Sequence, residues 1–150
     1  MGRRELLAAL GLVSMLAAGC AATGGNGDHT GGGQDKVVYH FSEGLAQATN
    51  GLRNIGNQLE VDPNAKIVVV SHALGVDFLM KGAKDKNGNK YEDLVEQLKM
   101  RGVQFDVCQI TLRNRKLSKD QFIEYVTYVP SGVAEITRLQ QHEGYAYLKP

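Results

Sequence analysis

Apolar positions along the chain follow two different spacings, one typical of strands and one typical of helices. Residues 36–41 and 67–71 are short apolar runs rich in β-branched side chains, which favour strands buried on both faces. The segment between them predicts a helix, because apolar residues recur on one helical face at Leu45, Leu52, Ile55 and Leu59. An Asp-Pro-Asn sequence at residues 62–64 favours a turn before the second strand.

The same alternation continues through the middle of the chain. Residues 75–80 predict a short helix, residues 84–90 a solvated loop, and residues 103–108 a third strand. Before the third strand lies an amphipathic helix that ends at Gly102 and carries apolar positions at Tyr91, Leu94, Val95 and Leu98.

The carboxyl-terminal part adds two further strands. Ser118 and Gln121 have the spacing of a capping box, which predicts a helix through about Glu124. Residues 125–129 and 145–148 predict strands, and the helix between them ends at Gly144 and carries Val133, Ile136 and Leu139. This alternation predicts an α/β fold, in which right-handed crossovers give a mostly parallel five-stranded sheet with helices on both faces.

Residues 1–19 have the pattern of a secretory signal peptide. Arg3 and Arg4 precede an apolar run at residues 6–18, which is too short to cross a bilayer as a mature helix. The alternative is a buried amino-terminal helix. The glycine-rich residues 20–35 that follow are typical of a flexible tether, whereas a core helix would connect more tightly to the fold. We therefore expect the protein to be exported.

The residues around Cys20 predict how the exported protein is held. Residues 16–20, Leu-Ala-Ala-Gly-Cys, resemble the bacterial lipobox, in which the cysteine becomes the lipidated amino terminus. Ordinary cleavage a residue or two later is the alternative, and the two arginines also weakly resemble a twin-arginine signal. We expect a periplasmic lipoprotein that contacts the membrane only through its amino-terminal lipid.

Composition narrows the class of protein further. The chain has 17 Lys+Arg against 16 Asp+Glu, a formal charge of +1, which argues against a nucleic-acid binder. With 43% hydrophobic residues and two cysteines, residues 36–150 are expected to form one domain without a disulfide scaffold. No phosphate-binding GxxxxGK[ST] motif occurs, and no set of four suitably spaced ligands is present, so we expect neither cofactor nor metal.

In a parallel sheet the functional site lies outside the carboxyl ends of the strands. The residues at that edge are predicted to be Ser42, Glu43, Ser71, His72, Cys108 and Ser131. Ser42 and Ser131 are also suited to capping the helices that follow them, and Glu43 to a first helical turn.

Cys108 is the strongest chemical candidate at this edge. If Cys20 is lipidated or removed, Cys108 is the one thiol of the mature protein. Asp106 should share its face, and the cations Arg113, Arg115 and Lys116 follow closely and would lower the pKa of a nearby thiol. The alternatives are a buried, inert cysteine and a solvated basic loop.

His72 is the second candidate, as a base or as a hydrogen-bond donor to a sulfur anion. The alternative is a histidine that only closes the end of a strand with one partner.

The folded part resembles the DsrE/DsrF-like sulfur-relay family. The matching stretches are IVVVSHALGVDFL (67–79), LKMRGVQFDVCQITL (98–112), VPSGVAEITRLQ (129–140) and GYAYLKP (144–150). The resemblance implies a three-layer α/β/α fold, homo-oligomers (often trimers or hexamers) and a persulfide on the cysteine matching Cys108. His72 matches a recurring histidine. The chain departs from the characterised relays in its export signal and in its lack of a second cysteine to resolve a persulfide.

Together these observations predict an exported, sulfurtransferase-like sulfur carrier that uses a persulfide on Cys108. His72 would assist it, with Asp106, Arg113 and Ser131 in supporting positions, and a sulfur donor and acceptor protein would be its partners. Two alternatives stay open: a non-catalytic binding or assembly module in which Cys108 is packing, and a thiol-redox sensor.

Overall fold

The computed structural model describes residues 33–150. The predicted signal peptide (1–19), Cys20 and most of the predicted tether (20–35) lie outside the described residues. The described part forms one parallel sheet with the strand order β4-β3-β2-β1-β5. The strands are β1 (Lys36–Phe41), β2 (Lys66–Ser71), β3 (Gln104–Cys108), β4 (Thr127–Val129) and β5 (Ala146–Leu148). The predicted α/β fold is therefore confirmed.

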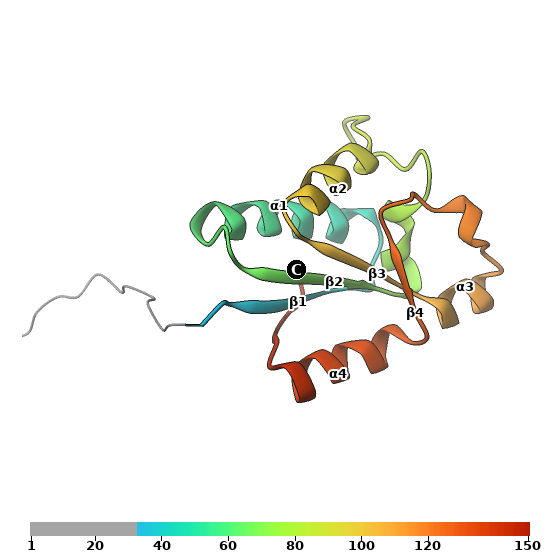
Figure 1. Ribbon diagram of the computed structural model, residues 1–150. Helices are drawn as coiled ribbons and strands as arrows, with labels where there is room; N and C mark the ends of the chain where they lie inside the picture. The colour runs from blue at the N-terminus through green and yellow to red at the C-terminus, as the bar shows by residue number, and fades with distance from the viewer. Residues whose placement is uncertain (1–32) are drawn as a thin grey trace, which may run out of the picture. The chain divides into compact units, whose positions relative to one another are not determined.

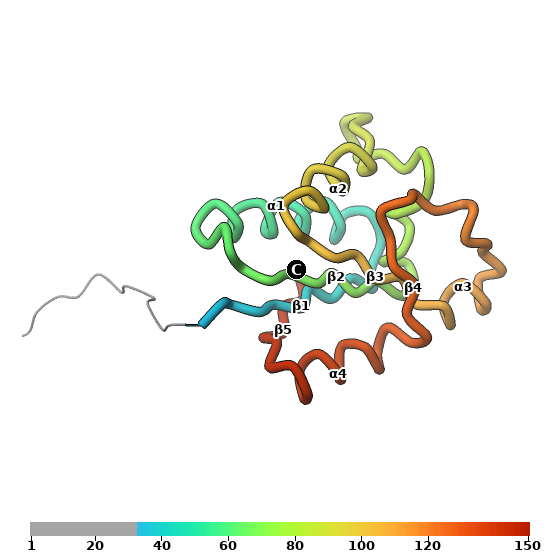
Figure 2. Tube along the Cα trace, viewed as in Figure 1, coloured from blue at the N-terminus to red at the C-terminus, as the bar shows by residue number. Residues whose placement is uncertain are grey.

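The helices form one layer on each side of this sheet. Figure 1 shows α1 (Leu45–Val61) and α2 (Tyr91–Met100) on one face, and α4 (Gly132–Glu143) on the other. The 3₁₀ helix η1 (Ala73–Leu79) belongs to the larger layer, and α3 (Gln109–Arg115) continues directly from β3. Figure 2 shows β5 alongside β1, where the chain returns after α4. None of the helices between residues 33 and 150 is both long and apolar enough to span a membrane.

Two cores of unequal size hold the layers together. Alternate strand residues, among them Val37, Tyr39 and Phe41, face the larger core beneath α1, η1 and α2. The intervening residues Val38, Val68 and Val70 face α4, where they meet Ile136, Leu139 and Tyr145. Among residues 33–150, a single helix thus covers the second face of the five-stranded sheet.

Most predicted elements are present, and the differences have local causes. The helix predicted from Ser118 to about Glu124 is only the short 3₁₀ helix η2 (Lys119–Gln121), although its capping box is formed. Phe122 and Ile123 are both buried, and Ile123 donates its N–H to the carbonyl of Leu79. Pairing with the neighbouring segment therefore replaces the last helical turn.

The helix starts were predicted with mixed success. Ser131 caps α4, with its hydroxyl accepting a hydrogen bond from the Ala134 N–H at 3.3 Å. The prediction for Ser42 is wrong, because Gly44 is the N-cap of α1 and the Gln47 side chain instead accepts the Ser42 N–H. Glu43 lies before the helix and pairs with Lys149 at the chain's end.

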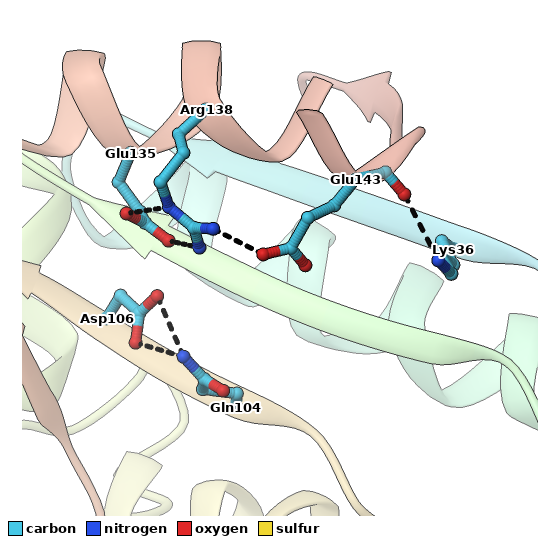
Figure 3. A network of polar contacts seen from close by, with 6 residues as sticks. All are labelled: Lys36, Gln104, Asp106, Glu135, Arg138 and Glu143. Atoms are coloured by element: carbon cyan, nitrogen blue, oxygen red, sulfur yellow. Dashed lines mark hydrogen bonds and ion pairs between the residues drawn. The ribbon is translucent and has the colours of Figure 1, made fainter. Parts of the chain in front are cut away.

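Asp106 is the one charged residue in the core of the described residues, and it lies beneath α4. Its side chain accepts hydrogen bonds from the Gln104 amide at 2.8 and 3.1 Å. Figure 3 shows this pair on β3 facing α4, where Arg138 bridges Glu135 and Glu143. Burial raises the pKa of Asp106 from its ordinary value of 3.8 to about 6, against the opposing effect of the Gln104 hydrogen bonds.

The burial of Asp106 predicts a pH-dependent cost to stability. Between about pH 4 and pH 6 the folded protein keeps a proton on this carboxyl that the unfolded chain has lost. The free energy of unfolding therefore has its full value below about pH 4 and falls as the pH rises through 6. Asp106→Asn cannot ionise and should raise the free energy of unfolding by up to about 3 kcal/mol at about pH 8, and by little at about pH 4. Urea unfolding at both pH values measures this difference. The exposed Asp93→Asn is the control, and an Asp106→Asn difference that does not change with pH contradicts the prediction.

Candidate functional site

The carboxyl edge of the sheet carries a pocket of about 440 Å³. Three predicted site residues line it: Cys108 at the end of β3, His72 just after β2, and Ser131 just before α4. The remaining wall comes from the start of η1, from α3 and from α4, through Ala73, Leu74, Ile110, Thr111, Asn114, Arg115 and Val133. The parallel arrangement therefore brings together residues that are far apart in the sequence.

The start of α4 packs closely over Cys108 and His72. A Cβ atom added at Gly132 would lie 3.3 Å from the Cβ atoms of both residues and 3.4 Å from Val70. The Cys108 residue is only 4% exposed, yet it forms part of the pocket wall. Cys108 is thus covered by the start of α4 on one side and borders the pocket on the other.

Hydrogen-bond donors around Cys108 favour its ionised form. Burial by itself raises the pKa of the thiol, but the backbone N–H groups of Gly132, Thr111 and Ile110 and the Thr111 hydroxyl lower it. The donors prevail, and the pKa of Cys108 lies below its ordinary value. The sulfur can therefore act as a thiolate nucleophile at a lower pH than an ordinary cysteine.

Thr111 connects the thiol to the end of the neighbouring strand. Its Oγ1 accepts a hydrogen bond from the Ala73 N–H at 2.9 Å, while its hydroxyl proton is available to the Cys108 sulfur. Ala73 has a φ of 50°, which is uncommon for a residue other than glycine. Arg115 also holds this turn by donating to the Ala73 carbonyl at 2.8 Å.

The basic residues after Cys108 are placed differently from one another. They belong to α3 and its cap, not to a loop. Arg115 lines the pocket but pairs with Asp77 at 2.6 Å, and Arg113 and Lys116 line a separate depression on the other side of α3. The groups that lower the pKa of Cys108 are hydrogen-bond donors where the sequence suggested cations.

His72 belongs to a chain of polar groups that runs along the sheet edge. Its Nε2 lies 2.6 Å from the Nε2 of His40, and the Nδ1 of His40 lies 2.6 Å from the Tyr147 hydroxyl. Burial lowers the pKa of both histidines, and the charge of Lys149 lowers both further. His72 also lowers the pKa of His40, which comes to about 4. At neutral pH both rings are uncharged, and the chain can carry a proton between half-exposed Tyr147 and the pocket wall.

Asp106 is separated from this pocket. It shares the α4-facing side of β3 with Cys108, but it is fully buried beneath α4 and is not part of the pocket wall. Within residues 33–150 no three histidine, cysteine or carboxylate side chains gather in a way that could hold a metal ion.

Sequence reasoning missed Thr111, Gly132 and His40. Cys108 is the N-cap residue of α3, so Thr111 lies three positions further on, where an N-cap side chain normally finds its donor. Reading Cys-Gln-Ile-Thr as a helix start would have found Thr111. Gly132 and His40 come from distant segments, and no local pattern places them beside Cys108.

The comparisons with known proteins agree with this fold. The sequence model of the DsrE/DsrF-like family matches residues 28–150. The solved structure of MTH1491, a protein of unknown function from Methanobacterium thermoautotrophicum, is similar to this chain, with 31% sequence identity and a TM-score of 0.69. The match covers 78% of this chain and 100% of the MTH1491 chain. The ychN protein from E. coli has 18% identity and a TM-score of 0.63, covering 78% of this chain and 99% of its own. No curated protein matches.

The hydroxyl of Thr111 should control the reactivity of Cys108. Thr111→Val removes this donor at nearly constant shape, so the pKa of Cys108 should rise and alkylation at neutral pH should slow by about tenfold. The pH dependence of the alkylation rate in the folded protein measures both. Thr111→Ser keeps the hydroxyl and should restore the wild-type profile, and Thr137→Val on the exposed face of α4 is the matched control. Equal profiles for Thr111→Val and wild type contradict this role.

Proposed function

The chain belongs to the DsrE/DsrF-like family, and we propose that it is an exported sulfur carrier that holds sulfane sulfur as a persulfide on Cys108. Membership of this family suggests a sulfur-relay-like role. The observation that supports the persulfide is the position of Cys108, an ionisable thiol in a pocket wall, surrounded by four hydrogen-bond donors.

The proposed reaction has two balanced steps. The Cys108 thiolate attacks the outer sulfur of a donor RS–SH, a new S–S bond forms, and RS⁻ leaves with the bonding pair. An acceptor thiolate then attacks the terminal sulfur of the Cys108 persulfide, and Cys108 leaves as its thiolate. A thiol of lowered pKa is a better leaving group, so the donors around the sulfur favour release as well as uptake. His72 and the polar chain behind it are placed to move protons at the pocket.

A non-catalytic binding module is the second candidate. The 4% exposure of Cys108 favours it, because a buried cysteine usually serves as a small apolar group. Alkylation separates the two functions. A Cys108 that reacts only after unfolding supports the binding module, and one that reacts in the folded state with a lowered pKa supports the carrier.

We also propose that the protein is periplasmic, anchored by a lipid on Cys20, and assembled as a trimer or hexamer. The sequence pattern of residues 1–20 and the family resemblance support these points. Sedimentation of the purified protein tests the assembly.

The carrier function predicts that Cys108 alone accepts sulfur. Protein treated with inorganic polysulfide should gain mass in steps of one sulfur atom, and a thiol reductant should reverse the gain. Cys108→Ser should abolish the gain, whereas the matched variant Cys20→Ser should keep it. Intact mass spectrometry measures the gain, and sulfur retained by Cys108→Ser would rule out the proposed carrier site.

Lipidation predicts a change of compartment when Cys20 is replaced. Wild-type protein should sediment with the membranes, and Cys20→Ser should appear in the soluble periplasmic fraction because its lipid anchor is absent. Cell fractionation and immunoblotting measure the distribution, with Cys108→Ser as the control that stays on the membrane. Equal distribution of Cys20→Ser and wild type would contradict the anchor.

A further inference from the structure

We propose that the pocket beside Cys108 selects an apolar organic persulfide as its sulfur donor, because its described lining is mostly apolar and the charge of its cationic side chain is paired. The inference rests on the proposed carrier function and specifies the substrate class of the same site. Three observations support it: the character of the rim, the state of its charges, and its size.

Exposed apolar side chains from three separate elements line the pocket, together with the exposed polar side chain of Asn114. Leu74 of η1 is 54% exposed, Ile110 of α3 is 39% exposed and Val133 of α4 is 61% exposed, and all three line the pocket. Scattered exposed apolar residues are ordinary, but these three surround one reactive group. An apolar group bound there would remove their surfaces from water, which is favourable.

The described pocket wall offers no free positive charge to an anionic donor. Arg115 is its cationic side chain, and this charge is paired, because Nη1 donates to the Asp77 carboxylate at 2.6 Å and to the Ala73 carbonyl at 2.8 Å. His72 is uncharged at neutral pH, because burial lowers its pKa. Thiosulfate and glutathione persulfide carry additional charges that would lose hydration here without a counter-charge. The hydrogen-bond donors around the sulfur suit the single charge of one thiolate.

The size of the pocket also favours an organic donor. Its volume of about 440 Å³ lies in the range of pockets that bind small organic ligands, about 300–1,000 Å³. A lone sulfur atom or a thiosulfate ion would leave most of this space to water. A donor with one aromatic or branched aliphatic group would fill it and present its outer sulfur to Cys108.

Transfer from such a donor needs no further reactant. The Cys108 thiolate attacks the outer sulfur of R–S–SH, the S–S bond of the donor breaks as the new one forms, and R–S⁻ departs with the electron pair. Charge and oxidation level are conserved, since one thiolate and one persulfide are exchanged for another pair. The apolar R group stays at the rim throughout and leaves with the thiolate.

The test compares donors on the Cys20→Ser protein, in which Cys108 is the one thiol. Benzyl hydropersulfide, glutathione persulfide and thiosulfate are offered separately, and the rate of sulfur addition to Cys108 is followed by mass spectrometry. Each rate is divided by that of free cysteine with the same donor. The benzyl donor should be preferred by about tenfold, and Val133→Ser should reduce the preference by about fivefold. Val61→Ser, the same substitution at the exposed end of α1, is the matched control and should keep the full preference.

A second measurement does not depend on sulfur transfer. Benzyl and sulfonatoethyl methanethiosulfonate both react with thiolates, and their rate ratio on Cys108, relative to free cysteine, reports the preference of the pocket. A ratio that favours the benzyl reagent and falls in Val133→Ser supports the inference. Equal normalised rates overturn it, and so does a loss of oligomer mass in Val133→Ser, which would make the rim a contact between copies of the chain.

The two proposals fail separately. Addition of sulfur from polysulfide without any preference among organic and charged donors overturns the donor class and leaves the carrier function intact. Failure of every donor to add sulfur to Cys108, with a normal benzyl preference in the second measurement, overturns the carrier function and leaves an apolar binding pocket.

Discussion

The chemistry of this site depends on a competition between burial and hydrogen bonding at one sulfur atom. Burial of Cys108 favours the neutral thiol, because a charge removed from water loses its hydration. Hydrogen-bond donors from the starts of α3 and α4 replace that hydration. Together they lower the pKa of Cys108 by more than burial raises it. The same donors require the strand end, both helix starts and the Thr111 hydroxyl to meet at one point, so the fold and the reactivity of the thiol are coupled.

Local sequence patterns were sufficient to predict much of the fold. Buried β-branched runs predicted β1 and β2, and the capping residues Ser131 and Gly144 predicted the ends of α4 correctly. The α3 helix was not predicted, because its seven residues are too few to show a period and its charged side chains suggested a loop. The early end of η2 depends on a pairing with the Leu79 segment, which is distant in sequence.

Part of the candidate site was predictable from the topology of the sheet. Placing Cys108, His72 and Ser131 at one sheet edge required only a parallel sheet, and all three line the pocket. The pairing of Arg115 with Asp77 and of His72 with His40 depends on side-chain geometry between distant segments. The sequence therefore suggested that nearby cations lower the pKa of Cys108, whereas in the structure hydrogen-bond donors lower it.

Three of the four groups that lower the pKa of Cys108 belong to the main chain. Every amino acid except proline carries an amide proton, so substitutions of the Ile110 or Thr111 side chain leave those amides in place. The lowered pKa therefore depends mainly on the path of the backbone, and the Thr111 hydroxyl is the one side-chain group among the four. A substitution of Ile110 can therefore change what the pocket admits while the main-chain donors to Cys108 stay in place.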